Sequence, residues 1–255
     1  MRTAFLIFII VTVCAPQLWA QQYLTIGMGY SGAFFGSDDL NHFKETYNWV
    51  NAPSLFKGLR GFAGSVGLRW EIGYRYLDRL SGAVLVGIQT YENQDMARYF
   101  NGEARELQLE IKSLYIEGEI GKTYKSFFVN GLFVLFFNRR ITLKSEYDEI
   151  WGEEPKSGLD GTYEGLTSNS ADLGISFGFF KDPFLLTLKV TYPLYTGGRS
   201  SVLRKVKSEK SKDRVPFFPS DYEAFLYGDA YHGVSNNIDG LKILVTGAFA
   251  VKIKK

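Results

Sequence analysis

The chain has 255 residues, 16% of them aromatic, with only 7 prolines and a formal net charge of +2. This composition excludes a disordered chain, and the length permits one or two folded domains. The small net charge also lacks the basic excess of a nucleic-acid-binding domain, so no nucleic-acid partner is predicted.

Residues 1–20 predict a secretory signal peptide. Arg2 supplies the basic start, residues 4–13 form a short apolar run, and Ala20 is a small residue just before a polar pair. This is the layout that precedes a cleavage site in exported proteins. We therefore expect cleavage after Ala20 and one domain over residues 21–255.

The exported chain must fold without disulfides. The only cysteine is Cys14, inside the predicted leader. Its neighbour Val13 is not the small residue that lipoprotein processing requires, so no lipid anchor is predicted. After the leader no stretch approaches the ~20 apolar residues of a membrane helix, so a membrane-spanning structure would have to be a closed β-barrel.

Eight runs with a two-residue hydrophobic period follow in order, and such alternation is typical of strands with two different faces. Most are longer than the usual strand of ~5–6 residues. They cover residues 23–36, 61–76, 81–91, 106–124, 126–144, 173–179, 186–194 and 241–255.

The fourth run changes its apolar parity. Leu109 and Ile111 share one face, whereas Leu114 and Ile116 lie on the other. A β-bulge near Lys112 and Ser113 would restore a single apolar face. In the fifth run Asn130, Asn138, Arg140, Thr142 and Lys144 share one side.

The connections alternate in length. Tight turns are predicted at 77–79, 123–125 and 181–183, and long loops at 37–59, 93–102, 145–167 and 197–239. An even number of antiparallel strands with short turns at one rim and long loops at the other is typical of bacterial outer-membrane barrels. Both ends of the exported chain then lie at the periplasmic rim.

Alternation alone leaves open whether lipid or water surrounds the barrel, since a lipocalin-like barrel would turn its polar face to water. The polar parity here is rich in small residues such as Ser65, Gly67 and Gly178, which suit a narrow eight-stranded interior. The apolar parity carries aromatics near the turns, such as Trp70 and Phe184, as interfacial girdles do. These patterns favour lipid outside.

On these runs, and on the final strand "DGLKILVTGAFAVKI", the chain resembles the small eight-stranded outer-membrane barrels of Gram-negative bacteria, the family of OmpA-like transmembrane domains and opacity-type proteins. The resemblance implies an all-β, up-and-down transmembrane barrel in the outer membrane. It also implies membrane lipid, lipopolysaccharide and the barrel-assembly machinery as partners. The ending Ile253-Lys254-Lys255 departs from the aromatic end that this machinery usually reads.

Ten charged residues are predicted to face the lumen. A polar pathway, or a carboxylate pair of Glu117 and Glu119 for acid and base work, is one interpretation. A mutually paired ion network that plugs the barrel is the interpretation we adopt, because isolated buried charges are too costly. The residues are Arg69, Glu71, Arg75, Glu117, Glu119, Lys122, Arg140, Asp172, Lys189 and Lys242.

The predicted loops hold the other candidates. Leu40, Phe43, Tyr47 and Val50 recur at helical spacing after Ser37, which predicts a short helix over the barrel mouth or on the lipid headgroups. A lid that packs only on its own loops is the alternative that we favour. The third loop is acidic at Glu146, Asp148, Glu149, Glu153 and Glu154, with the options of binding calcium or of pairing with the basic fourth loop. The fourth is a possible anionic-ligand loop with Arg199, Arg204, Lys205, Lys207, Lys210, Lys212 and Arg214. It could bind lipopolysaccharide phosphates or another polyanion, although a run of charges is usually only a solvated loop.

The function predicted from these features is structural or adhesive, through the external loops. An enzyme that modifies lipid A is an alternative, in which His42 near Ser37, Asp38 and Asp39, or His232 near Asp229 and Ser235, would act, but neither arrangement is specific. A small-solute channel or a secretion or transport accessory is another. No catalytic residue, metal site or cofactor is predicted.

Overall fold

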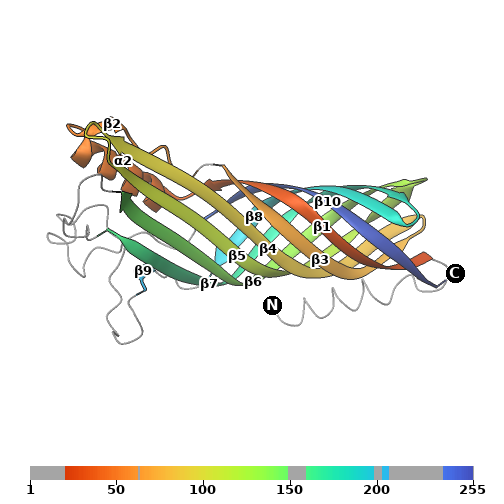
Figure 1. Cartoon of the computed structure of the whole chain (residues 1–255). Helices are drawn as coiled ribbons and strands as arrows, with labels where there is room; N and C mark the ends of the chain where they lie inside the picture. Colours follow the sequence, from red (N-terminus) through yellow and green to blue (C-terminus); the bar gives the residue numbers. More distant parts are fainter. Residues whose placement is uncertain (1–20, 63, 149–158, 198–202, 207–237, 255) are drawn as a thin grey trace.

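A computed structural model describes residues 21–62, 64–148, 159–197, 203–206 and 238–254. Eight long strands form one closed ring, in which each pairs antiparallel with its neighbour along the chain and the first pairs with the last (Figure 1). They are β1 (Gln21–Gly36), β3 (Ser65–Leu77), β4 (Leu80–Tyr99), β5 (Ala104–Tyr124), β6 (Phe127–Asp148), β7 (Gly161–Lys181), β8 (Phe184–Gly197) and β10 (Asp239–Lys254).

Short turns gather at one rim. They are Asp78–Arg79, Lys125–Ser126 and Asp182–Pro183, and the second lies slightly later in the chain than predicted. The start of β1 pairs with the end of β10, so both ends of the ring lie at this rim. At the opposite rim two connections are shorter than predicted: only residues 100–103 separate β4 from β5, and residues 149–160 separate β6 from β7. The predicted leader lies outside the described residues.

Strands β4 to β7 project beyond the rest of the ring (Figure 1). β5 has 21 residues and β6 has 22, about twice the ~9–11 residues that a tilted strand needs to cross a bilayer. The strands therefore divide into a lower part that can lie in a membrane and an outer extension.

The outer face of the lower barrel is apolar. Large side chains on it are about half exposed, for example Ile175 at 49% and Leu186 at 53%. Rows of such residues continue around the ring, as in the cross-strand row Ile72, Val86 and Ile116. Water would make so large an exposed apolar surface unfavourable, whereas a hydrocarbon surrounding satisfies it.

The predicted bulge in β5 is wrong. β5 pairs with β4 in unbroken register from Leu80 opposite Lys122 to Arg98 opposite Ala104. Leu109 and Ile111 point into the barrel, whereas Leu114 and Ile116 point out. The apolar side chains of β5 change sides because the surroundings of the barrel change. The exterior of the lower barrel meets hydrocarbon, whereas the exterior of the extension meets water.

A bulge lies instead on the neighbouring strand. Lys112 pairs with Arg140 and Leu114 with Phe137, so β6 contains one extra residue at this level. Asn138, with a φ of 49°, adopts the left-handed conformation that asparagine tolerates better than most residues. The extra residue reverses which β6 side chains face inward.

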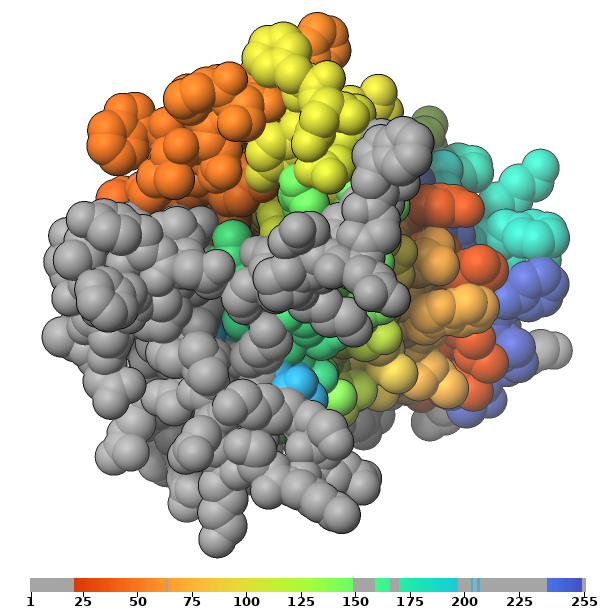
Figure 2. All heavy atoms as spheres, turned by 60° about the vertical axis from the view of Figure 1, so that its left-hand side comes forward, coloured from red at the N-terminus to blue at the C-terminus, as the bar shows by residue number. Residues whose placement is uncertain are grey.

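A short helix packs against the outer end of the ring. α2 (Asp38–Asn51) follows Ser37, whose side-chain oxygen accepts a hydrogen bond from the Leu40 backbone N–H, as predicted for its first turn. Strand β2 (Leu55–Lys57) then pairs with the end of β4, and Figure 2 shows this segment, in orange, against the β4–β5 tip, in yellow. Within the described residues, no helix is both long and apolar enough to cross a bilayer.

Candidate functional site

In the barrel interior, two glycines leave space for two aromatic rings. A Cβ atom on Gly178 would lie 1.9 Å from the Phe128 ring, and one on Gly87 would lie 2.4 Å from the Tyr115 hydroxyl oxygen. Each glycine is the cross-strand partner of its ring, and only glycine leaves room for the ring against the neighbouring strand.

An arginine guanidinium group lies over each of these two rings. The Arg69 guanidinium carbon lies 3.8 Å from the centroid of Tyr115, and that of Arg75 lies 4.8 Å from the centroid of Phe128. Both guanidinium groups are thus held by cation–π contacts in positions where they have almost no exposure to solvent.

Three carboxylates complete what we call the lower ion group. Arg75 makes a bidentate pair with Glu119 at 2.9 and 3.0 Å, and Arg69 contacts Glu117 at 2.6 Å. Further contacts of the group join Arg69 to Glu71 at 3.0 Å and Lys189 Nζ to Glu117, Glu71 and Glu119 at 2.7, 3.2 and 3.3 Å. Three cations therefore face three anions, and the group is electrically balanced.

A second cluster, the upper ion group, lies nearer the outer rim. Lys242 Nζ lies 2.7 Å from Asp172 and 2.5 Å from Asp239, and Arg139 contacts Asp239 at 2.9 Å. The Thr191 hydroxyl adds a hydrogen bond to Asp172. Two cations again match two carboxylates, as the high cost of an unpaired buried charge requires.

The structure corrects two of the ten predicted lumen residues. Lys122 and Arg140 are exposed on the outer wall. Lys122 lies on the outward parity of β5, and the bulge at Asn138 turns Arg140 outward and Arg139 inward. The other eight, Arg69, Glu71, Arg75, Glu117, Glu119, Asp172, Lys189 and Lys242, lie inside.

Sequence reasoning missed four interior charged residues: Arg139, Asp239, Arg105 and Asp95. Arg105 contacts Asp160 at 2.7 Å, inside the extension. Its parity on β5 is the same as that of Glu117 and Glu119, and this signal could have identified it. The interpretation of Glu117 and Glu119 as an acid and base pair lacks substrate access, because both are fully buried among cations.

An apolar cap lies above the upper ion group. Leu40, Phe43 and Tyr47 of α2 pack with the inward side chains of the extension, among them Leu109 and Leu143. Burial and a hydrogen bond with the Tyr99 hydroxyl raise the pKa of the Tyr47 hydroxyl. The helix therefore lies over the mouth rather than on the lipid headgroups, and the alternative of a lid that packs only on its own loops is wrong.

Asn48 and Asp95 hold residues 59–61, which follow β2, in place by hydrogen bonds. The Asn48 amide accepts from the Leu59 N–H at 2.8 Å and donates to the Leu59 carbonyl at 2.9 Å. One Asp95 carboxylate oxygen accepts from the N–H groups of Arg60 and Gly61 at 2.8 and 2.7 Å. Both side chains reach backbone groups that strand pairing leaves open.

We expect Asp95→Ala to loosen this segment. Loss of two charge-assisted hydrogen bonds, each worth about 1.5–3 kcal/mol, should raise the rate of tryptic cleavage at Lys57 and Arg60 tenfold or more in membrane-inserted protein. The measurement is a digestion time course followed by mass spectrometry. Asp78→Ala, at the opposite rim, is the matched control, and equal cleavage in both variants would contradict this role of Asp95.

The remaining predicted site residues are dispersed. His42 is exposed on α2, while Ser37 is engaged as its N-cap. Glu146 and Asp148 are exposed on β6, and β9 (Arg204–Lys205) pairs with β7. Outside the described residues lie His232, Glu149, Glu153, Glu154, Arg199, Lys207, Lys210, Lys212 and Arg214. No cluster of His, Cys, Asp or Glu suited to a metal ion occurs among the described residues.

The polarity of the two barrel faces decides the class of protein. The interior holds the paired charges beside smaller apolar clusters, and large apolar side chains cover the exterior, whereas a water-soluble barrel carries polar side chains outside. The chain is an eight-stranded transmembrane β-barrel. The water-soluble alternative is therefore wrong.

Comparisons with known proteins find solved structures of low sequence identity. No protein-family model and no curated protein matches the chain. Among solved structures, Ail, the attachment invasion locus protein of Yersinia pestis, crystallised with the heparin analogue sucrose octasulfate, has 9% identity and a TM-score of 0.42. The match covers 91% of this chain and 99% of that one. Neisserial surface protein A has 10% identity and a TM-score of 0.30, with 91% and 97% covered. At these values the assignment as an outer-membrane barrel rests on the closed ring and its apolar exterior.

Proposed function

We propose that the chain is a non-conducting outer-membrane barrel whose outer end binds a surface ligand. The observation that carries this proposal is the lower ion group, in which Arg69, Arg75 and Lys189 are each within hydrogen-bonding distance of at least one carboxylate. An eight-stranded barrel has an interior only just wide enough for its side chains. The ion groups and the cap then act as a plug.

The proposed orientation places the short-turn rim, with both ends of the ring, in the periplasm after cleavage of residues 1–20. Support comes from the outer extension, whose outward side chains are mostly polar and include Glu92, Gln94 and Gln108. Long external loops and short periplasmic turns are usual in barrels of this class. Assembly by the barrel-assembly machinery belongs to the same proposal.

A planar bilayer tests the plug. We expect the purified protein, with insertion verified by its heat-dependent gel mobility, to give no discrete conductance steps. The matched variant Arg75→Ser with Glu119→Ser removes one bidentate pair and leaves the charges balanced, so it should stay folded and admit ions. Stable steps from the unaltered protein would overturn the proposal.

The proposed ligand is a polyanionic glycan. At the outer end Trp49, Phe56 and Phe100 are 79%, 71% and 72% exposed, and the last two rings lie 5.9 Å apart. Exposed aromatic clusters of this kind mark interaction sites, and the basic residues of 199–214 supply complementary charge.

Binding of a sulfated polysaccharide to the barrel in nanodiscs tests this ligand. We expect the triple variant Lys207→Gln, Lys210→Gln and Lys212→Gln to bind with lower affinity. Its affinity should also depend less on the salt concentration. The same number of lysines replaced at the short-turn rim and outer wall, Lys122, Lys125 and Lys181, should leave it unchanged. Equal losses in both sets would reject the loop as the binding element.

A further inference from the structure

Three surface zones follow one another up the outer wall formed by β3 to β6. The lowest is an apolar groove of about 640 Å³. Its walls include Trp70, Ile88, Leu114 and Phe137. The next outward residues above Ile88 and Leu114 are polar, Thr90 and Lys112. A groove at this height is suited to an acyl chain that stands against the barrel.

A basic pair lies directly above the groove. Lys112 and Arg140 are cross-strand partners, which places their Cβ atoms about 4.5–5.5 Å apart. Both side chains are exposed, and the bulge at Asn138 is what turns Arg140 to this side. Lys112 contacts Glu110 at 2.5 Å. Arg140 has no carboxylate within ion-pair distance among the residues that the structure describes. A guanidinium and an ammonium side by side at the edge of the hydrocarbon suit a lipid phosphate.

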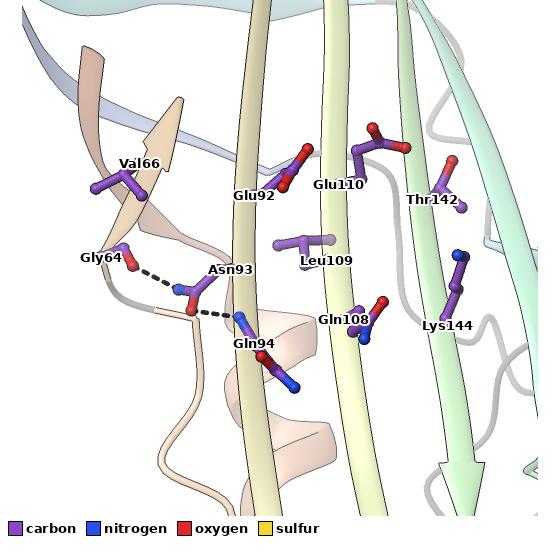
Figure 3. A pocket seen from close by; sticks show the side chains of 10 residues that line it. All are labelled: Gly64, Val66, Glu92, Asn93, Gln94, Gln108, Leu109, Glu110, Thr142 and Lys144. Carbon is purple, nitrogen blue, oxygen red and sulfur yellow. Dashed lines mark hydrogen bonds between the residues drawn. The ribbon is translucent and has the colours of Figure 1, made fainter. Parts of the chain in front are cut away.

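The third zone is a polar hollow of about 610 Å³ above the basic pair (Figure 3). Figure 3 shows its side chains on neighbouring strands, with the amides of Gln94 and Gln108, the carboxylates of Glu92 and Glu110, and Lys144 around it. Amides, carboxylates and an ammonium group together offer both donors and acceptors at close spacing. This is the chemistry that recognises a sugar rich in hydroxyl groups.

We propose that this wall binds lipopolysaccharide, the phosphorylated glycolipid of the outer leaflet. One acyl chain lies in the apolar groove, a phosphate group contacts Lys112 and Arg140, and sugar hydroxyls occupy the polar hollow. A phospholipid fits the lower two zones but leaves the hollow empty, and a soluble glycan leaves the groove empty. The proposal rests on the orientation given above but is independent of the plug and of the polyanion ligand, which concern other surfaces.

The main test compares two double variants with the same loss of charge. Lys112→Gln with Arg140→Gln removes the proposed phosphate contacts. Lys57→Gln with Arg98→Gln is the control, since these residues also are cross-strand partners but lie at the outer end of the extension. Both variants should retain the heat-dependent gel shift of the folded barrel. Binding of purified lipid A in detergent is expected to weaken tenfold or more in the first variant and to stay unchanged in the control.

A second pair of measurements tests the hollow. Gln94→Ala with Gln108→Ala should lower the amount of full lipopolysaccharide retained per barrel during purification, while binding of phosphatidylglycerol remains unchanged. Wild-type affinity of the Lys112 and Arg140 variant for lipid A would overturn the proposal. So would equal affinity of the unaltered barrel for phosphatidylglycerol and lipopolysaccharide, because the hollow would then contribute nothing.

Discussion

Replacement of Lys189 by methionine is expected to lower the free energy of unfolding of the barrel by about 3–5 kcal/mol. The Lys189 ammonium group contacts three carboxylates, those of Glu117, Glu71 and Glu119. Without it these three anions face only Arg69 and Arg75, and one negative charge stays buried without a partner. The measurement is urea unfolding in lipid vesicles, followed by heat-dependent gel mobility and tryptophan fluorescence.

The double variant Lys189→Met with Glu117→Gln separates charge balance from side-chain packing. It leaves two carboxylates, Glu71 and Glu119, opposite the two arginines, with an amide of nearly the same size in place of the third. We expect it to recover at least half of the stability lost in Lys189→Met. If Lys189→Met alone is as stable as the unaltered barrel, the interior is hydrated enough to solvate the unpaired charge, and the plug fails with it.

The lower barrel could be predicted from the sequence because side chains alternate strictly across a strand. Once Leu24 and Ile26 are placed outside, the parity of β1 follows, and the same holds for the apolar residues of β7 and β10. Each tight turn ends one strand, so the alternation of inward and outward side chains is assigned anew for the strand that follows. For these elements no information about neighbouring strands was needed.

The extension could not be predicted in the same way. A change of apolar parity along one strand has two possible causes, a bulge or a change of the surrounding solvent. The change between Ile111 and Leu114 in β5 is open to both explanations, because only the register with β4 distinguishes them. The bulge at Asn138 left no clear mark in the apolar pattern of β6. It turns Arg139 inward and Arg140 outward, the opposite of the prediction.

The ion pairs themselves also escaped prediction. Lys189 and Glu117 lie on β8 and β5, which are not neighbours in the ring, and Arg139 meets Asp239 from a strand far along the chain. Parity identifies which charges face inward, but their heights depend on strand tilt and stagger. The sequence could therefore suggest a balanced network without assigning its partners.

Replacement of Val86 by arginine is expected to destabilise the folded barrel in a bilayer by about 2–4 kcal/mol. Val86 is 43% exposed on the outer face of β4, between Ile72 and Ile116 on the neighbouring strands. An arginine there must leave water for hydrocarbon, or bend toward an interface. Urea unfolding in vesicles measures the loss.

Gln94→Arg is the matched control, since Gln94 lies on the same strand and the same outward face, beyond the apolar rows. Its effect should stay within about 0.5 kcal/mol, as for an ordinary surface substitution. Because both variants add the same charged side chain to one strand, the difference between them reports the surrounding medium alone. Equal, small effects at both positions would mean that water surrounds Val86, and the membrane assignment of the whole barrel would have to be withdrawn.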